Sequence, residues 1–249
     1  MVAIHTAQEI AAMHVAGRLV AQTFAHLTPM IVPGVTTLAL DTAAEKFIRS
    51  HGAVPAYKGY NGFPATICVA PNSVICHGIP NNDALNAGDI VGLDIGVIVD
   101  GWYGDACVTL PVGAISPTAQ KLIDVTREAL RRGIAAAQLG KHLGDIGAAI
   151  QQHAEANGYS VVREYTGHGV GRRLHEDPTV HHVGQGGTGL KLKEGMIFTI
   201  EPMINAGTYK TTLDKRDKWT VRTADGQLSA QFEHTIAITA AGPQILTQE

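Results

Sequence analysis

The sequence has 249 residues, of which 45% are hydrophobic and 16% charged, and its formal net charge is −3. This length is sufficient for one large domain with a buried core, and the lack of a basic run or a long apolar segment argues against a nucleic-acid surface and a membrane span. Three cysteines without CxxC spacing and an N-terminus unlike a signal peptide predict a cytoplasmic globular protein.

Helices are predicted where apolar residues recur every three or four positions behind a capping residue. The first begins at Thr6, because Thr6 and Glu9 have the spacing of a capping box, and its apolar stripe continues to Leu27. Ser116 followed by Pro117 is a typical start for a later helix. The predicted helices cover residues 6–27, 37–51, 116–139 and 143–157.

A hairpin is predicted in the middle of the chain. Residues 90–99 alternate between apolar side chains and glycine or aspartate, which indicates a strand with one apolar face. Asp100-Gly101 is a two-residue turn signal that returns the chain along residues 102–110. In that register Asp94 and Asp105 lie diagonally on one face, roughly 7–8 Å apart. Two buried carboxylates repel each other and lose hydration, and a metal ion is the simplest neutraliser.

Further strands alternate with the helices. Asp225-Gly226 predicts a second hairpin, and Pro202 closes another strand. Helices mixed with antiparallel strands indicate an α+β fold, and each half offers about two helices followed by hairpins, so a weak duplication within one domain of residues 1–249 is expected. These remaining predicted strands cover residues 196–201, 219–223 and 228–238.

Three more residues share the character of the hairpin carboxylates. Glu201 ends an apolar strand, Glu233 alternates onto a polar face, and His168 stands between glycines that let a ligand approach. Four carboxylates and one imidazole suit two divalent ions such as Mn, Fe or Co better than one tetrahedral zinc. Two such ions activate a water for attack on a carbonyl, which predicts hydrolysis, of an amide in particular. Taken singly, each residue could instead be a cap, a strand end or an ordinary loop residue.

The ordered motifs resemble those of type I methionine aminopeptidases over residues 5–240. Asp94 and Asp105 belong to this set, and the other matching segments are 74–80 (VICHGIP), 166–171 (TGHGVG), 175–178 (HEDP), 200–202 (IEP) and 231–235 (QFEHT). The resemblance implies the pita-bread fold, in which two pseudo-symmetric halves of antiparallel sheet and flanking helices enclose a dinuclear metal site.

The same resemblance implies roles for the metal ligands. Asp94 would chelate one ion, Asp105 and Glu233 would bridge both, and His168 with Glu201 would complete the second. A hydroxide between the ions would be the nucleophile, with Glu201 as the proton carrier. Co, Mn, Fe, Zn or Ni could fill such a site, and the sequence does not choose among them.

The resemblance also implies a substrate pocket and a second cation site. His77 and His175 would contact the substrate and stabilise the tetrahedral intermediate. Leu174 departs from the Phe of many relatives and predicts a slightly looser pocket. The methionine pocket would be lined by Tyr57, Tyr60, Phe63, Cys68 and Trp219, and a monovalent cation would lie near Asn72, Val74 and Ser229.

The expected activity is removal of the initiator methionine from nascent polypeptides whose second residue is small. We expect a monomer that meets the ribosome transiently and has no nucleic-acid specificity. Proline-specific peptidases share the fold but usually carry an extra N-terminal domain. Type II methionine enzymes carry a helical insertion, whereas only 32 residues separate Glu201 from Glu233 here. A non-catalytic binding module is the rival from another class, although such proteins typically lose metal ligands.

Overall fold

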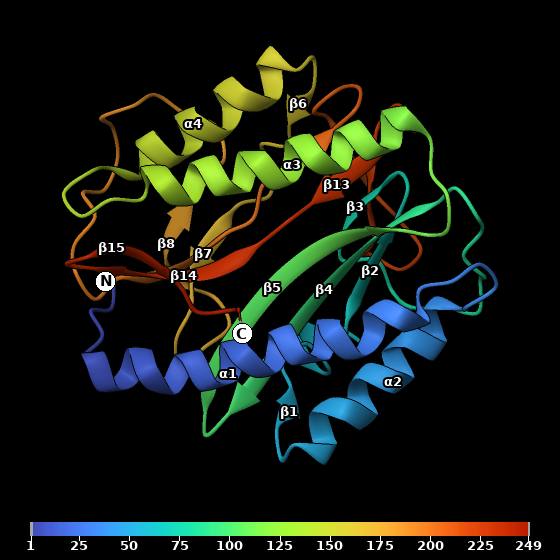
Figure 1. Ribbon diagram of the computed structural model, residues 1–249, viewed down its shortest axis with the longest axis horizontal. Helices are drawn as coiled ribbons and strands as arrows, with labels where there is room; N and C mark the ends of the chain where they lie inside the picture. Colours follow the sequence, from blue (N-terminus) through green and yellow to red (C-terminus); the bar gives the residue numbers. More distant parts are fainter. Residues whose placement is uncertain (1, 249) are drawn as a thin grey trace.

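The computed structural model describes residues 2–248 (Figure 1). Within this range the chain forms α1 (Ala7–Leu27), α2 (Thr37–Ser50), α3 (Pro117–Ala136) and α4 (Leu143–Ala156), with short 3₁₀ turns at Thr28–Met30 and Tyr60–Gly62. The predicted helices are confirmed to within a few residues at each end. The capping box is present, because the Glu9 N–H donates to Thr6 Oγ1 and the Thr6 N–H donates to Glu9 Oε2.

The strands of this range form antiparallel sheets. One sheet has the order β1-β4-β2 with β5 also on β4, and the others have the orders β13-β10-β6, β11-β12-β3 and β15-β14-β9-β7-β8. The α+β prediction is therefore confirmed. The strands are β1 (Val54–Pro55), β2 (Cys68–Pro71), β3 (Val74–Cys76), β4 (Ile90–Val99), β5 (Trp102–Pro111), β6 (Ser160–Val161), β7 (Gly167–Gly169), β8 (Glu176–Val180), β9 (Ile197–Ile200), β10 (Met203–Asn205), β11 (Thr211–Leu213), β12 (Val221–Thr223), β13 (Ser229–Gln231), β14 (His234–Thr239) and β15 (Gly242–Ile245).

The β4–β5 hairpin has the predicted register. Gly96 pairs with Asp105 and Asp94 pairs with Cys107, as the two-residue turn requires. Both turn residues, Asp100 and Gly101, have positive φ angles of 49° and 76°, which is the conformation that Asp-Gly favours in tight hairpins. The turn thus places both aspartates on one face of the hairpin.

The prediction of a second hairpin around Asp225-Gly226 is wrong. β12 pairs with β11 and β3, whereas β13 pairs with β10, and the expected strand 228–238 is divided into β13 and β14. The Asp225 carboxylate accepts hydrogen bonds from the N–H groups of Thr208 and Gln227, which makes the segment a wider loop than a two-residue turn. Strand pairing here is decided by distant segments.

Two helix pairs enclose the strands (Figure 1). α1 and α2 lie on one side, beside β4 and β5, and α3 and α4 lie on the opposite side, above the strands of the C-terminal half. The first half buries one core and the second half buries another. The first core contains Leu19, Leu40, Val91, Leu93 and Ile95, and the second contains Leu122, Ile123, Ile150, Phe198 and Ile236. This arrangement agrees with the duplication expected from the sequence.

Among residues 2–248, no helix is both long enough and apolar enough to cross a membrane.

Replacing Gly17 with alanine is expected to lower stability, although alanine normally stabilises a helix by about 1 kcal/mol relative to glycine. A Cβ atom at Gly17 would lie 2.1 Å from the main-chain oxygen of Leu246, so α1 or the C-terminal segment must move. Overpacking of this kind costs roughly 1–3 kcal/mol. We expect thermal unfolding of the variant to give a Tm several degrees lower than that of the wild type. Ala11→Gly, at an exposed position of α1, is the control that measures the effect of helix propensity without this contact. An unchanged or higher Tm for Gly17→Ala would contradict this contact.

Candidate metal centre

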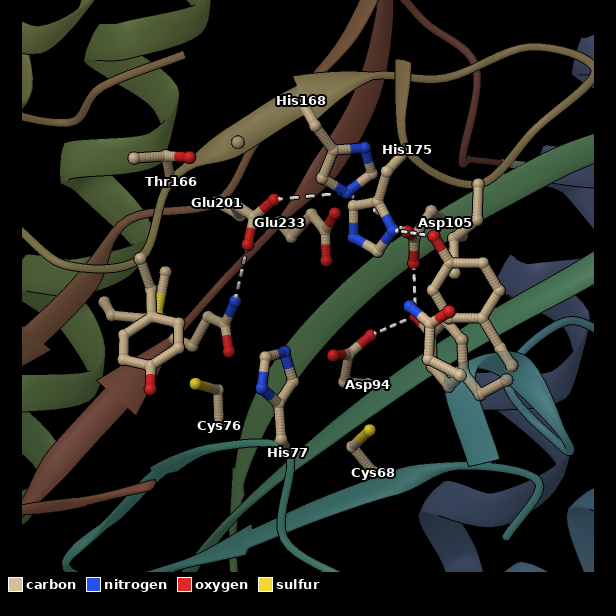
Figure 2. A pocket seen from close by; sticks show the side chains of 18 of the residues that line it. Cys68, Cys76, His77, Asp94, Asp105, Thr166, His168, His175, Glu201 and Glu233 are labelled. Carbon is tan, nitrogen blue, oxygen red and sulfur yellow. Dashed lines mark hydrogen bonds and ion pairs between the residues drawn. The ribbon is translucent and has the colours of Figure 1, made fainter. Parts of the chain in front are cut away.

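A cavity of about 660 Å³ lies between the two halves and collects every residue predicted for the site. Figure 2 shows the labelled histidines and carboxylates pointing towards one another from different strands and loops. The lining includes Tyr57, Tyr60, Phe63, Cys68, His77, Asp94, Asp105, His168, His175, Glu201, Trp219 and Glu233. Residues separated by more than 100 positions in the sequence therefore meet in one space.

Asp94 and Asp105 enter the cavity from β4 and β5. The hydroxyl of Tyr57 contacts Oδ1 of both carboxylates, so one phenol links the two side chains. Gly96, opposite Asp105, makes room for the tyrosine ring, since a Cβ there would lie 2.5 Å from Tyr57 Cε1. The two aspartates thus form one side of the cluster.

His168, Glu201 and Glu233 form the other side. His168 Nε2 lies 3.7 Å from Asp105 Oδ2 and 3.6 Å from Glu201 Oε1. Ligand atoms of Asp105, His168 and Glu233 all lie within 4.8 Å of one another. The remaining two predicted ligands adjoin this group, Asp94 through the Tyr57 hydroxyl and Glu201 through His168.

Burial controls the protonation of this cluster. Loss of hydration raises the pKa of Asp94, Glu201 and Glu233 well above their ordinary values, and the neighbouring carboxylates raise it further. Burial likewise raises the pKa of Asp105 to about 7. Without a cation, the fold therefore cannot hold all four groups ionised at neutral pH.

The donor chemistry fits divalent cations. His168 Nδ1 is 2.9 Å from the Gly169 carbonyl oxygen, which only accepts hydrogen bonds, so this nitrogen carries the ring proton. In the neutral ring the lone pair of Nε2 then faces the oxygens of Asp105 and Glu201, and a cation between them would satisfy all three. Carboxylate oxygens with one imidazole suit ions such as Mn, Fe and Co.

The rings of His77 and His175 line the cavity beside this cluster. His175 Nδ1 lies 2.7 Å from the Tyr60 hydroxyl, and its ring centroid is 4.2 Å from that of His168. Burial lowers the pKa of both His77 and His175 to about 4, so both rings are neutral at pH 7. Neutral imidazoles can donate or accept a hydrogen bond at a polar substrate group.

An apolar wall adjoins the aspartate side of the cavity. Tyr57, Phe63, Cys68 and Leu174 are buried together, and Trp219 meets Phe63 edge to face at a centroid distance of 5.1 Å. Tyr57 and Phe63 of this wall come from the stretch 55–64, which contains one 3₁₀ turn. An apolar side chain entering here would lie next to the acidic cluster.

Residues that orient Glu201 were missed by the sequence interpretation. His182 Nε2 accepts a hydrogen bond from the Glu201 N–H at 3.0 Å, and Thr199 Oγ1 donates to Glu201 Oε1 at 2.8 Å. Gln231 Nε2 donates to Glu201 Oε2 at 3.4 Å. Gln231 could have been found, because it alternates with Glu233 on one face. His182 carries no comparable signal, since only the folding of separate segments brings it to Glu201.

The residues predicted for a monovalent cation lie near one another. The Ser229 N–H donates to the Asn72 carbonyl oxygen at 2.9 Å, and Val74 begins β3 close by in the chain. The Asn72 side chain is engaged by Asp89 and by the Ile90 N–H. Cation binding at this place stays a prediction.

Comparison with known proteins agrees with the motifs. Residues 11–240 match metallopeptidase family M24. The chain is 54% identical to methionine aminopeptidase A of Synechocystis sp., with 96% of this chain and 95% of that protein aligned. It is 49% identical to methionine aminopeptidase 1 of Bacillus subtilis over the full length of both.

Solved structures of methionine aminopeptidases resemble the whole chain as well. The crystal structure of methionine aminopeptidase from Rickettsia prowazekii superimposes with a TM-score of 0.98 at 51% identity, covering 99% of this chain and 100% of that one. The resemblance predicted from the motifs and the pita-bread fold are both confirmed.

Proposed function

The chain belongs to metallopeptidase family M24, and from this membership we propose that it is a metal-dependent aminopeptidase that removes N-terminal methionine from polypeptides. The observation that carries the proposal is the buried cluster of carboxylates and His168 directly beside an apolar, aromatic wall. The cluster supplies a hydrolytic centre, and the wall supplies a place for the methionine side chain.

Two divalent ions are proposed to occupy the cluster. Asp94, Asp105, His168, Glu201 and Glu233 would hold them, and Co, Mn, Fe, Zn or Ni are all compatible with this donor set. Such ions would lower the pKa of a bound water, so that it ionises to hydroxide near neutral pH, and would polarise the scissile carbonyl.

The chain's own residues would position the substrate and move the proton. Glu201 is oriented by Thr199 and Gln231, so its carboxylate can take the proton of the attacking water and return it to the leaving amine. The neutral rings of His77 and His175 can donate a hydrogen bond to the oxygen that gains negative charge. The Tyr60 hydroxyl holds the His175 ring in place.

The methionine side chain is proposed to enter between Phe63, Cys68, Trp219 and the Tyr57 ring. Aromatic faces and a thiol suit a flexible, polarisable thioether. Leu174, buried in the same wall, would leave this pocket slightly looser than a phenylalanine would.

The decisive experiment is peptide hydrolysis by metal-stripped protein reconstituted with Mn or Co. We expect free methionine from Met-Ala-Ser and Met-Pro-Ser, and no cleavage of Ala-Pro-Ser. Cleavage of Ala-Pro-Ser would instead assign the chain to the proline-specific branch of the fold. Metal uptake without turnover of any of the three peptides would favour the non-catalytic binding module.

A long second residue is expected to slow hydrolysis strongly. The reacting carbonyl must reach the buried acidic cluster, and the rings of His77 and His175 stand at that position, so a large neighbouring side chain would collide with the cavity wall. We expect the kcat/KM for Met-Lys-Ser to be at least about 100-fold below that for Met-Ala-Ser, a steric discrimination of roughly 3 kcal/mol. Equal values for the two peptides would refute selection for small second residues.

The remaining parts of the proposal concern the cellular setting. Residues 1–249 are proposed to act as one catalytic domain and as a monomer on nascent chains in the cytoplasm, in transient contact with the ribosome. A monovalent cation near Asn72, Val74 and Ser229 would bind outside the acidic cluster.

A further inference from the structure

Tyr57 is held against the metal-site hairpin by its own main chain. Pro55 of β1 pairs with Val97 of β4, and the Ala56 N–H donates to the Gly96 carbonyl oxygen at 2.9 Å. These bonds place the next residue, Tyr57, over the part of β4 that contains Asp94 and Gly96. The missing side chain at Gly96 leaves room for the ring, whose hydroxyl contacts both aspartates.

The hydroxyl contacts carboxylate oxygens that could otherwise bind a metal ion. It contacts Oδ1 of Asp94 and Oδ1 of Asp105, while Oδ2 of Asp105 faces His168 instead. The tyrosine is only 7% exposed, so water does not readily replace it. The phenol therefore covers the aspartate side of the cluster and leaves the His168 side open (Figure 2 shows the two aspartates and their dashed contacts).

We propose that Tyr57 is a positioning residue that joins Asp94 to Asp105 in the metal-free protein and competes with a metal ion for their Oδ1 atoms. The inference rests on the proposed assignment of these aspartates as metal ligands. A hydrogen bond made only in the metal-free state stabilises that state and so weakens metal binding by the same free energy. Removing the hydroxyl should therefore tighten metal binding.

Tyr57→Phe tests this directly, because it deletes one oxygen and keeps the ring. A hydrogen bond to a buried carboxyl group corresponds to roughly 2- to 10-fold in an equilibrium constant. In calorimetric titration of metal-stripped protein with Mn or Co, we expect the Kd of the variant to be roughly 2- to 10-fold lower than that of the wild type. The Tm of the metal-free variant should be several degrees below that of the metal-free wild type. The Tm of the metal-loaded variant should equal that of the metal-loaded wild type.

The matched control is Tyr159→Phe, the same chemical change at a buried tyrosine in the other core. Its Kd for the metal should equal that of the wild type. Equal or weaker metal binding by Tyr57→Phe would overturn the inference, whatever the Tm of its metal-free form. Failure of the wild type to bind either metal would overturn the metal site itself, whereas normal binding by the wild type with an unaltered Kd in Tyr57→Phe would refute only the role of Tyr57.

Discussion

Asp105→Asn is expected to abolish loading of the metal site and to lower hydrolysis of Met-Ala-Ser by more than about 100-fold. Even residues that merely orient metal ligands change affinity or activity by about 10- to 100-fold when replaced, and Asp105 is a proposed bridging ligand. Its carboxylate is buried and lies 3.7 Å from His168 Nε2, so an amide cannot supply the same charge to a cation. Metal content by elemental analysis and kcat/KM would be measured together.

The fold should survive this substitution. Asparagine has nearly the same shape, and it removes one of several mutually repelling buried carboxyl groups, so the metal-free variant should be at least as stable as the metal-free wild type at pH 7.5. Glu233→Ala should give the same loss of metal and activity. Asp83→Asn, at an exposed position, is the matched control and should leave both unchanged. Full turnover and full metal content in Asp105→Asn would refute the site assignment.

The metal-stripped protein is expected to lose stability as the pH rises from about 6.5 to 8. In the unfolded chain the carboxyl groups are already ionised in this range, whereas burial raises the pKa of Asp94, Glu201 and Glu233 well above their ordinary values in the folded state and that of Asp105 to about 7. The folded state then binds more protons than the unfolded state, so its stability falls with pH. Each carboxyl that stays protonated contributes about 1.4 kcal/mol per pH unit.

Below pH 6.5 the histidines oppose this trend. His77, His175 and His234 have pKa values of about 4 in the folded protein, and His182 has a pKa of about 3, against 6.5 when unfolded. The unfolded state therefore takes up more protons, and stability rises with pH between 4 and 6.5. This histidine contribution fades above pH 6.5 and is small by about pH 7.5, where the carboxyl contribution dominates.

Thermal unfolding at several pH values, with a chelator and with added Mn, measures the effect. The Tm of the chelated protein should fall steadily from pH 6.5 to 8, and the Tm of the Mn-loaded protein should change little, because the ions offset the charge of the carboxylates. Asp105→Asn should show a shallower fall near pH 7 than the wild type. A chelated wild type whose Tm is level or rises over this range would contradict carboxyl protonation in the metal-free site.

Much of the local structure could be predicted because its causes are local. Thr6 and Glu9 cap α1 through contacts three residues apart, and Asp100-Gly101 sets the β4–β5 register through two left-handed residues. By contrast, the turn signal at Asp225-Gly226 did not predict strand pairing. There the pairings of β12 with β3 and of β13 with β10 join distant parts of the chain and replace the pairing that the turn predicts.

The types of residue at the site, their order along the chain and the placement of Asp94 and Asp105 on one face could all be predicted from the sequence. The hydrogen bond from the Glu201 N–H to His182 and the position of the Tyr57 hydroxyl between the two aspartates became visible in the folded chain. Contacts of the first kind follow from the geometry of one hairpin or one helix. Those of the second kind join segments 19 to 48 residues apart, and their positions depend on how whole sheets and helices pack around the cavity.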